Sequence, residues 1–414
     1  MVLRGKPLPW QDWLGSHADA FWLHREGEIR PRLETYTARL SRRDGGTVAK
    51  LHATGAGKRP TLPARNAQRL GTNLADLGAP RVLRASRDGQ TGCHWCQVNC
   101  RHWHWIDVDY APGGRDMFLD DFEPTYAIHA MLDLQATGDS LQDRLHHLRE
   151  VDRRLTLPIE QMGCDAIDVG VGLAALFEGL ERGLIPLSDV PPALRRGPYL
   201  GDLDAAGHAV RALRQGESWP GMRAVGNGPQ SLAERYPALQ QILFTCGPGT
   251  LGNPGHANAL WTFLMPFSRF FGHYVGQLYK VEGDLPLDAD PKQVLPLFEE
   301  VIRLALQREF FGCLGNALSA CAFTFVVFSQ DGRGTRLDDS DLLVRTLASY
   351  GIETSREELD WFAQAFWAQS IAFKLERGWQ PPTAADFPAR VFEALSLALN
   401  RPVAELRTLM DQLI

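Results

Sequence analysis

The chain has 414 residues, of which 44% are hydrophobic and 22% are charged, and its formal net charge is −6. This length allows two or three domains with sizeable cores, and the ordinary balance of apolar and charged residues excludes wholesale disorder. The basic residues form no long run, so we expect no nucleic-acid partner. No uninterrupted apolar run reaches the ~18 residues that a membrane span needs, and no secretion signal is recognisable, so we expect a cytoplasmic protein without a membrane partner.

The N-terminal stretch, residues 1–62, is expected to be a short segment of mixed or β structure. It combines charge with glycine, and "SRRDGG" and "ATGAGKRP" are typical of turns and loops. The stretch "LETYTARLSRR" (residues 33–43) is interpreted as an extended segment of a short hairpin.

Three cysteines stand together in "GCHWCQVNC", which begins at Gly92. Cys93, Cys96 and Cys100 have the spacing C-x₂-C-x₃-C, so one loop can point three thiolates at a common centre. The chain has seven cysteines and no export signal, which argues against a disulfide framework and favours metal or redox chemistry. An iron–sulfur cluster fits a compact triplet with a remote fourth thiolate. The alternatives are a zinc site, which usually uses two separated pairs, and three unrelated buried cysteines.

The fourth ligand is not fixed by the residues themselves. Cys164, Cys246, Cys313 and Cys321 all carry the required thiol, and spacing does not choose among them.

Residues 63–230 are interpreted as a helical domain that carries the triplet. Two helices separated by "TGDS" are predicted after it, and a third follows Cys164, with Gly183 near its end. Within that third helix, Gly170-Val-Gly172-Leu-Ala-Ala175 imitates a dinucleotide-binding fingerprint but lacks the strand context, so its glycines are interpreted as helix-packing positions. Residues 187–230 are expected to be loops around one short helix.

Residues 231–414 are interpreted as a second helical domain, so the fold class is mostly α. A capping box at Ser355 and Glu358 predicts a helix that ends near Gly378. Its predicted apolar stripe consists of Leu359, Phe362, Phe366 and Phe373.

The order of four motifs resembles the aldehyde ferredoxin oxidoreductase family. "LPARN" at Leu62 is similar to the family's "LPTRN", and the cysteine triplet and "FEPTYAIHAM" follow in the family's order. "GCDAIDVGVGLAALFEGLERGLI" and "ALSACAFTF" are similar to the family's D-x-x-G-x-D and D-x-x-G-L-C segments. The likeness covers about residues 60–400, the family's two helical domains.

The resemblance implies a set of site residues. It implies a [4Fe-4S] cluster held by Cys93, Cys96, Cys100 and Cys321. It also implies an active-site carboxylate at Glu123 and a proton-transferring imidazole at His256. The aspartates beside Glu123 leave open a simple helix-start charge cluster, and capping is the alternative for His256.

Two departures bear on the family's tungstopterin or molybdopterin. The first motif here is Glu160-Gln-Met-Gly163-Cys164-Asp165, in which the longer glutamate stands in place of the family's first aspartate. The second motif is Asn316-Ala-Leu-Ser319-Ala-Cys321, which lacks the family's aspartate and glycine. A lost carboxylate leaves buried pterin donors unpaired, at about 1–3 kcal/mol each. In addition, residues 1–62 cannot replace the family's pterin-cradling domain. We therefore expect no tungstopterin held by this chain alone.

The leading hypothesis is an iron–sulfur oxidoreductase that acts on a small molecule, with an aldehyde or carboxylate as the substrate class the family implies and a ferredoxin-like redox partner. One alternative is an electron-transfer or scaffold subunit that pairs with a pterin-binding partner. Another is a non-redox enzyme in which an open iron of the cluster acts as a Lewis acid, which requires that Cys321 does not bind it. A homo-oligomer is a separate expectation for the partners of the chain.

Overall fold

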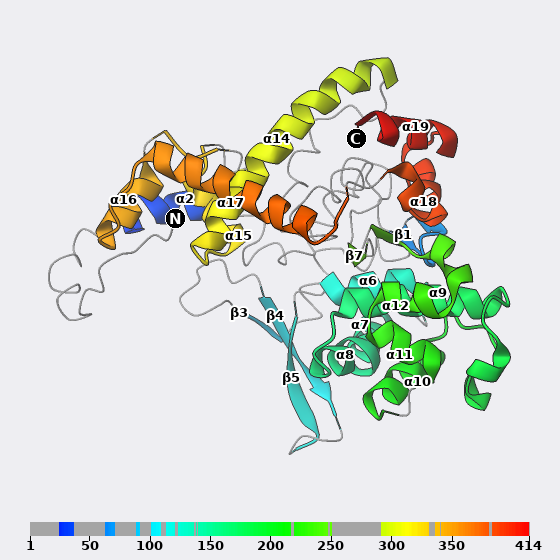
Figure 1. Ribbon diagram of the computed structural model, residues 1–414. Helices are drawn as coiled ribbons and strands as arrows, with labels where there is room; N and C mark the ends of the chain where they lie inside the picture. The colour runs from blue at the N-terminus through cyan, green and yellow to red at the C-terminus, as the bar shows by residue number, and fades with distance from the viewer. Residues whose placement is uncertain are drawn as a thin grey trace. The chain divides into compact units, whose positions relative to one another are not determined.

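The structure is a computed structural model that describes residues 25–36, 63–70, 88–91, 101–108, 113–120, 123–135, 138, 140–216, 219–246, 249–250, 291–330, 336–339, 341–380 and 383–413. These residues are predominantly helical (Figure 1), as the sequence predicts. The chain forms two compact units. The first comprises Met1–Arg39 and Phe267–Gln380, and the second comprises Leu40–Pro266 and Pro381–Ile414. Each compact unit combines stretches that are distant in sequence. The predicted domain boundaries after residues 62 and 230 stay predictions.

The second unit is built around the helix α9 (Ala166–Glu181), whose residues from Val169 to Leu180 are all buried. The two helices predicted on either side of "TGDS" are α6 (Glu123–Met131) and α7 (Leu141–Val151). Ser140 begins α7 with a capping box, because its hydroxyl accepts from the Asp143 N–H and the Asp143 carboxylate accepts from the Ser140 N–H. Behind α7 the chain continues without a break through the π-helical segment η2 (Asp152–Thr156) into α8 (Leu157–Gln161).

The glycines of α9 serve helix packing, as predicted. A Cβ at Gly170 would stand 2.8 Å from the Ile128 side chain of α6, and one at Gly172 would stand 3.3 Å from Val225. Only residues without a side chain allow these backbones to approach so closely. The apparent dinucleotide fingerprint therefore lies inside one buried helix rather than at a strand-to-helix turn.

The stretch after α9 holds more helix than the sequence predicts. Pro220 and Pro229 occupy first positions of helices, where the missing N–H costs nothing, and Asp202 caps α10 through the N–H groups of Asp204 and Ala205. The elements are η3 (Leu187–Asp189), η4 (Pro192–Leu194), α10 (Leu203–Arg214), α11 (Pro220–Gly226), α12 (Pro229–Arg235), η5 (Pro237–Ile242) and the paired strands β6 (Thr245–Cys246) and β7 (Gly249–Thr250).

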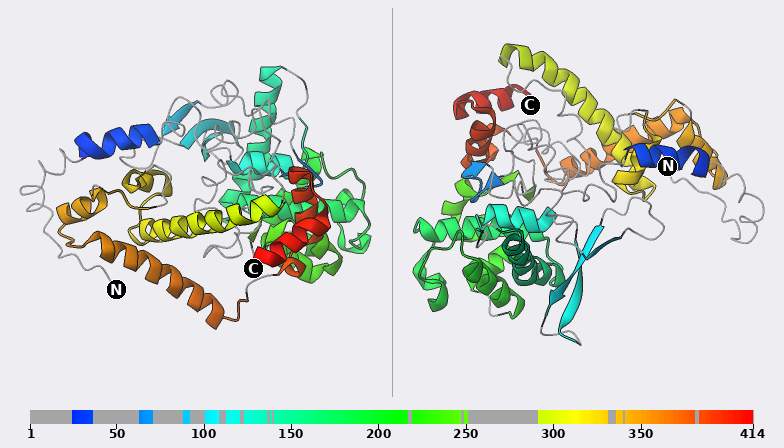
Figure 2. Two further views of the ribbon diagram at one scale, coloured as in Figure 1. Left: turned by 90° about the horizontal axis from the view of Figure 1, so that it is seen from above. Right: turned by 180° about the vertical axis from the view of Figure 1, so that it is seen from behind.

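A three-stranded antiparallel sheet flanks the cysteine triplet in the sequence, with one strand before Cys93 and two strands after Cys100. Its order is β3 (Gly89–Thr91), β4 (Arg101–Asp107) and β5 (Arg115–Asp120), and the β4–β5 ribbon is the long hairpin of Figures 1 and 2. Successive residues of β4 alternate between the two faces. His104 and Ile106 are buried, and Ile106 packs with Val108 and with Leu157 of α8. Trp105 lies on the opposite face and is exposed.

Residues 63–70, which begin within "LPARN", form a tight hairpin with a left-handed turn. Strands β1 (Pro63–Ala64) and β2 (Arg69–Leu70) pair around it, and Arg65, Asn66 and Ala67 have φ angles of 50°, 48° and 57°. The N–H groups of Arg65 and Asn66 donate to carbonyls at the end of α6. These bonds hold a conformation that L-residues otherwise avoid.

A buried carboxylate, Glu178, joins this hairpin to an arginine of the C-terminal helices. Glu178 of α9 accepts from Asn66 Nδ2 at 2.6 Å and from Arg390 Nη2 at 2.6 Å. Arg390 belongs to α18 (Ala389–Leu399), which follows η11 (Ala384–Asp386) and precedes α19 (Val403–Leu413). The C-terminal helices of this unit are thus tied to α9 and the hairpin through one carboxylate.

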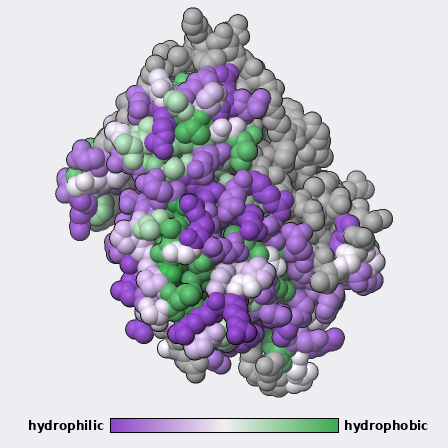
Figure 3. All heavy atoms as spheres, turned by 90° about the vertical axis from the view of Figure 1, so that its right-hand side faces the viewer, coloured by the Kyte–Doolittle hydropathy of each residue, from purple (hydrophilic) through white to green (hydrophobic). Residues whose placement is uncertain are grey.

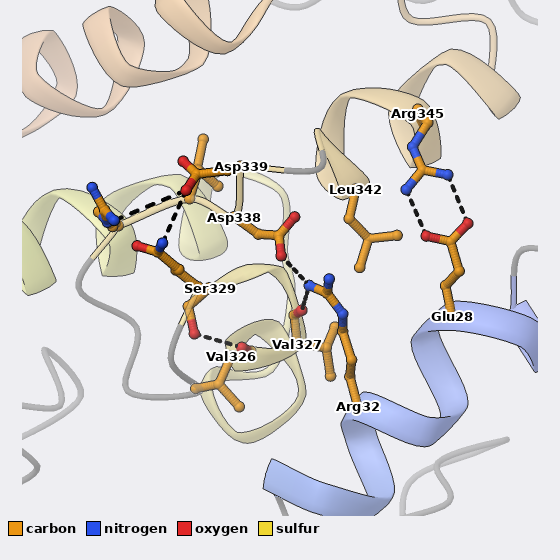
Figure 4. A network of polar contacts seen from close by, with 12 residues as sticks. Glu28, Arg32, Val326, Val327, Ser329, Asp338, Asp339, Leu342 and Arg345 are labelled. Carbon is orange, nitrogen blue, oxygen red and sulfur yellow. Dashed lines mark hydrogen bonds and ion pairs between the residues drawn. The ribbon is translucent and has the colours of Figure 1, made fainter.

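The first unit contains η1 (Arg25–Ile29), α2 (Arg30–Tyr36), α14 (Pro291–Ala317), α15 (Ala322–Phe325), η10 (Val326–Phe328), α16 (Leu342–Ser349) and α17 (Arg356–Glu376). Figure 4 shows how α2 joins it: Arg32 donates to Asp338 at 2.5 Å and to the Val327 carbonyl at 3.2 Å. The extended structure expected for "LETYTARLSRR" is wrong for its first residues, Leu33–Tyr36, which are helical. The Arg30–Glu34 ion pair and the Thr35 hydroxyl bond to the Pro31 carbonyl favour the helix there.

Helix α17 begins as predicted, with the capping box of Ser355 and Glu358, and it ends at Glu376 before Gly378, whose φ is 84°. Its apolar stripe is only partly buried: Leu359 is buried, whereas Phe373 is 56% exposed. On the face drawn in Figure 3, hydrophilic side chains predominate and hydrophobic ones form separate patches. Among the described helices, none has both the length and the apolar composition that crossing a bilayer requires.

Candidate functional site

Cys321 lies at a sharply defined turn in the first unit. Helix α14 ends at Ala317, Ser319 adopts the left-handed conformation with φ 55°, and Cys321 is the N-cap of α15. The Cys321 carbonyl accepts from the N–H groups of Thr324 and Phe325, at 3.0 and 2.8 Å, which fixes its backbone. The side chain is exposed and is a free thiol. A thiolate here could reach a cofactor without any change in the core.

Close packing behind Cys321 holds α15 in place. Phe325 packs against Phe311 of α14 with ring centroids 4.7 Å apart. A Cβ at Gly315 would stand 2.8 Å from the Phe325 ring, so this glycine lets the ring lie directly on α14. Cys321 is therefore presented by a rigid corner rather than by a mobile loop.

The turn at Gly163 in the second unit has the same backbone design. Gly163 has φ 75°, its N–H donates to the Glu160 carbonyl, and the Cys164 N–H donates to the Ile159 carbonyl. At Ser319 the corresponding donors are the Ser319 and Ala320 N–H groups, which reach the carbonyls of Asn316 and Gly315. Both turns are helix C-terminal motifs of the Schellman type.

In these two turns Asp165 and Cys321 occupy the same position, the N-cap of the next helix. Asp165 uses Oδ1 to accept from the N–H groups of Ile167 and Asp168, whereas Cys321 makes no side-chain cap. The Cys321 thiol therefore does not cap its helix, whereas the Asp165 carboxylate does.

The other described cysteines are less suited to bind a cofactor. Cys313 is completely buried on α14, and Cys164 is partly exposed in the turn at Gly163. Cys93, Cys96, Cys100 and the side chain of Cys246 lie outside the described residues. Within the described residues, no three side chains of His, Cys, Asp or Glu gather as a metal site.

The two predicted catalytic residues are located only in part. Glu123 is the first residue of α6, and its side chain lies outside the described residues, as does all of His256. Their predicted roles stay predictions.

A buried polar cluster formed by residues of α6, β4 and η2 was not predicted from the sequence. Asp152, at the start of η2, accepts a hydrogen bond from the Thr125 hydroxyl at Oδ1, and its Oδ2 lies 3.1 Å from His104 Nε2. The Thr156 hydroxyl lies 3.1 Å from that of Thr125, and all four side chains are buried. Burial first, and the nearby Asp152 second, raise the pKa of Tyr126 above its usual range. The cluster lies at the buried π-helical segment η2, and π-helical turns are frequent at functional sites.

A second buried contact joins α6 and α7. His129 Nε2 and His147 Nε2 are 2.9 Å apart, and the rings meet edge to face. Burial first, and the neighbouring His147 second, lower the pKa of His129 to about 3. The pKa of His147 is lowered too, again chiefly by burial. The pair is therefore neutral near pH 7 and shares one hydrogen bond.

A family model described as "Aldehyde ferredoxin oxidoreductase, domains 2 & 3" matches residues 29–413. The chain belongs to the aldehyde ferredoxin oxidoreductase family. The predicted resemblance is thereby confirmed, and so is the mostly helical fold that it implies.

Among solved structures, the chain is similar to the active-site complex BamBC of benzoyl coenzyme A reductase in complex with 1,5-dienoyl-CoA. The sequence identity is 13% and the TM-score is 0.53, and the match covers 99% of this chain and 66% of that chain. At this identity the likeness shows a shared fold. A search of the curated proteins returned no match.

Proposed function

We propose that the chain is an iron–sulfur oxidoreductase of the aldehyde ferredoxin oxidoreductase family, which acts on a small molecule and holds no tungstopterin by itself. Cys93, Cys96, Cys100 and Cys321 would hold a [4Fe-4S] cluster, which supplies single electrons when bound. The observation that carries the proposal is the free, exposed thiol of Cys321 on a rigid corner after α14.

Burial supports Cys321 over Cys313 as the fourth ligand. Four thiolates are needed, and each must be deprotonated at the cluster. Cys313 is 0% exposed, and burial in apolar surroundings disfavours a thiolate. Cys321 avoids that cost, and replacing it removes no core packing.

The proton chemistry would fall to Glu123 and His256. Glu123 begins α6, where the N-terminal end of the helix favours the ionised carboxylate, the form that can accept a proton. An imidazole at His256 would hold or release a proton near neutral pH. The missing acid at Asn316 supports the view that no pterin is bound by this chain alone, because an amide that replaces a carboxylate accepts fewer N–H groups.

Anaerobic analysis of iron and sulfide tests the proposal. The unaltered chain is expected to contain both, with the broad visible absorbance of a cluster. Cys321→Ser should lose at least part of its iron and still fold, because serine is favoured at an N-cap. Cys164→Ser is the matched control from the turn of the same design, and it should keep the full cluster. A chain without iron and sulfide, or Cys93→Ala with undiminished absorbance, would overturn the proposal. Full iron content and activity in Cys321→Ser would instead favour the Lewis-acid alternative.

A second candidate is a subunit that works with a separate polypeptide. The solved structure similar to this chain is named as a complex of two components, and this chain spans 66% of the matched chain. Purification under native conditions, followed by mass measurement and tungsten and molybdenum analysis, tests it. A partner that carries a pterin would favour this candidate, whereas an active chain without any partner would count against it.

A further inference from the structure

The buried carboxylate of Asp152 contacts two elements that are separate in sequence. Thr125 lies on α6 and donates to Oδ1, whereas His104 lies on β4 and meets Oδ2 at 3.1 Å. Asp152 itself is on neither element, since it begins η2. One side chain with no exposed surface thus connects a strand, a helix and a π-helical segment of the second unit.

Both connected elements adjoin residues of the proposed site. Strand β4 begins at Arg101, directly after Cys100, and α6 begins at Glu123, two residues before Thr125. His104 is the fourth residue after Cys100 in the sequence, so an anchor at His104 holds the strand that follows the triplet.

We propose that Asp152 is a positioning residue, which holds the strand behind the cysteine triplet and the helix that begins at Glu123 in fixed register. This inference rests on the proposed function. Outer partners of metal ligands orient the ligands, and their loss typically weakens metal binding about 10–100-fold. Asp152 acts on the proposed ligands less directly than such a partner, through the backbone of β4 and of α6.

A carboxylate offers two acceptor oxygens, whereas an asparagine amide offers one oxygen and one NH₂ group. Asp152→Asn therefore keeps an oxygen for only one of the two contacts, that with the Thr125 hydroxyl or that with His104 Nε2. The π-helical register is set by the bond from the Leu157 N–H to the Asp152 carbonyl, and it places Thr156 beside the same hydroxyl.

The test measures how fast iron leaves the full-length protein. Anaerobically loaded chain is mixed with a ferrous-iron chelator well below its unfolding temperature, and electron paramagnetic resonance spectra of the dithionite-reduced cluster are recorded in parallel. Asp152→Asn and Thr125→Val should release iron about tenfold faster and show altered spectra. Thr125→Ser, which keeps the hydroxyl, should behave like the unaltered chain. Asp107→Asn is the control on β4, because it makes the same chemical change at an exposed position.

The outcomes separate this inference from the proposed function. If the unaltered chain holds no iron and sulfide, the proposed function is overturned and the inference falls with it. If the chain holds its cluster and both Asp152→Asn and Thr125→Val release iron at the unaltered rate, only the positioning role is overturned. Should Asp152→Asn fail to fold, the comparison of Thr125→Val with Thr125→Ser decides. Equal rates of iron release from these two variants refute the positioning role, whereas faster release from Thr125→Val alone supports it.

Discussion

The buried pair of His129 and His147 makes the stability of the second unit depend on pH. Their Nε2 atoms are 2.9 Å apart, and burial lowers the pKa of His129 to about 3. In the unfolded chain an imidazole has a pKa of about 6.5. Because the folded pKa lies below the unfolded one, protonation favours the unfolded state. The stability associated with His129 is complete above about pH 6.5 and is lost as the pH falls towards 3.

The size of this loss follows from the two pKa values. At pH 5.5, one unit below the unfolded pKa, His129 lowers the free energy of unfolding by about 1.4 kcal/mol. His147 adds a loss in the same direction, since its pKa is lowered as well. Acid should therefore weaken the α6–α7 contact well before carboxylates begin to protonate.

Urea unfolding at pH 7.5 and 5.5, on matched preparations, measures the effect. His129→Gln removes the titrating group and keeps a side chain that can hydrogen-bond to His147, so its loss between the two pH values should be smaller than that of the unaltered chain by about 1.4 kcal/mol. The cost of the substitution itself cancels, because each protein is compared with itself. Equal losses in the two proteins would refute the reasoning, since they would mean that His129 accepts a proton while folded.

Three further substitutions test the packing and the backbone, each by the change in the free energy of unfolding in urea. Ser319→Gly should stabilise by about 0.5–1 kcal/mol, because glycine adopts a φ of 55° without strain; an unchanged or lower stability would contradict the left-handed turn. Arg390→Ala should destabilise by about 1–3 kcal/mol, since it removes a buried hydrogen bond between charged groups while Glu178 keeps Asn66 and Arg182 as partners; an unchanged stability would show that the pair is open to water. Gly170→Ala should destabilise by about 1–3 kcal/mol despite alanine's better helix propensity, because its Cβ would meet Ile128 at 2.8 Å; a gain in stability would mean that α6 and α9 separate freely.

Local chemistry predicted those elements whose signals lie within a few residues. The capping box of Ser355 and Glu358 fixed the start of α17, and the glycines at 170 and 172 indicated a helix packed against its neighbours. The family motifs were equally readable, because their residues occur in a set order along the chain.

Long-range contacts explain what the sequence did not reveal. The hydrogen bond from Thr125 to Asp152 and the contact of Asp152 with His104 join three separate segments, so no window of sequence contains them. The start of "LETYTARLSRR" was interpreted as part of an extended segment of a short hairpin. Yet the Arg30–Glu34 pair lies one helical turn apart and favours the helix that forms.

The hairpin of "LPARN" has a consequence for how the chain folds. Each of its three left-handed residues costs roughly 1–2 kcal/mol, so this turn has no tendency to form by itself. It becomes favourable once the last turn of α6 offers its carbonyls and the ion pair of Glu178 and Arg390 is in place. We therefore expect the motif nearest the start of the family likeness to be among the last parts of the second unit to become ordered, after helices that are synthesised hundreds of residues later.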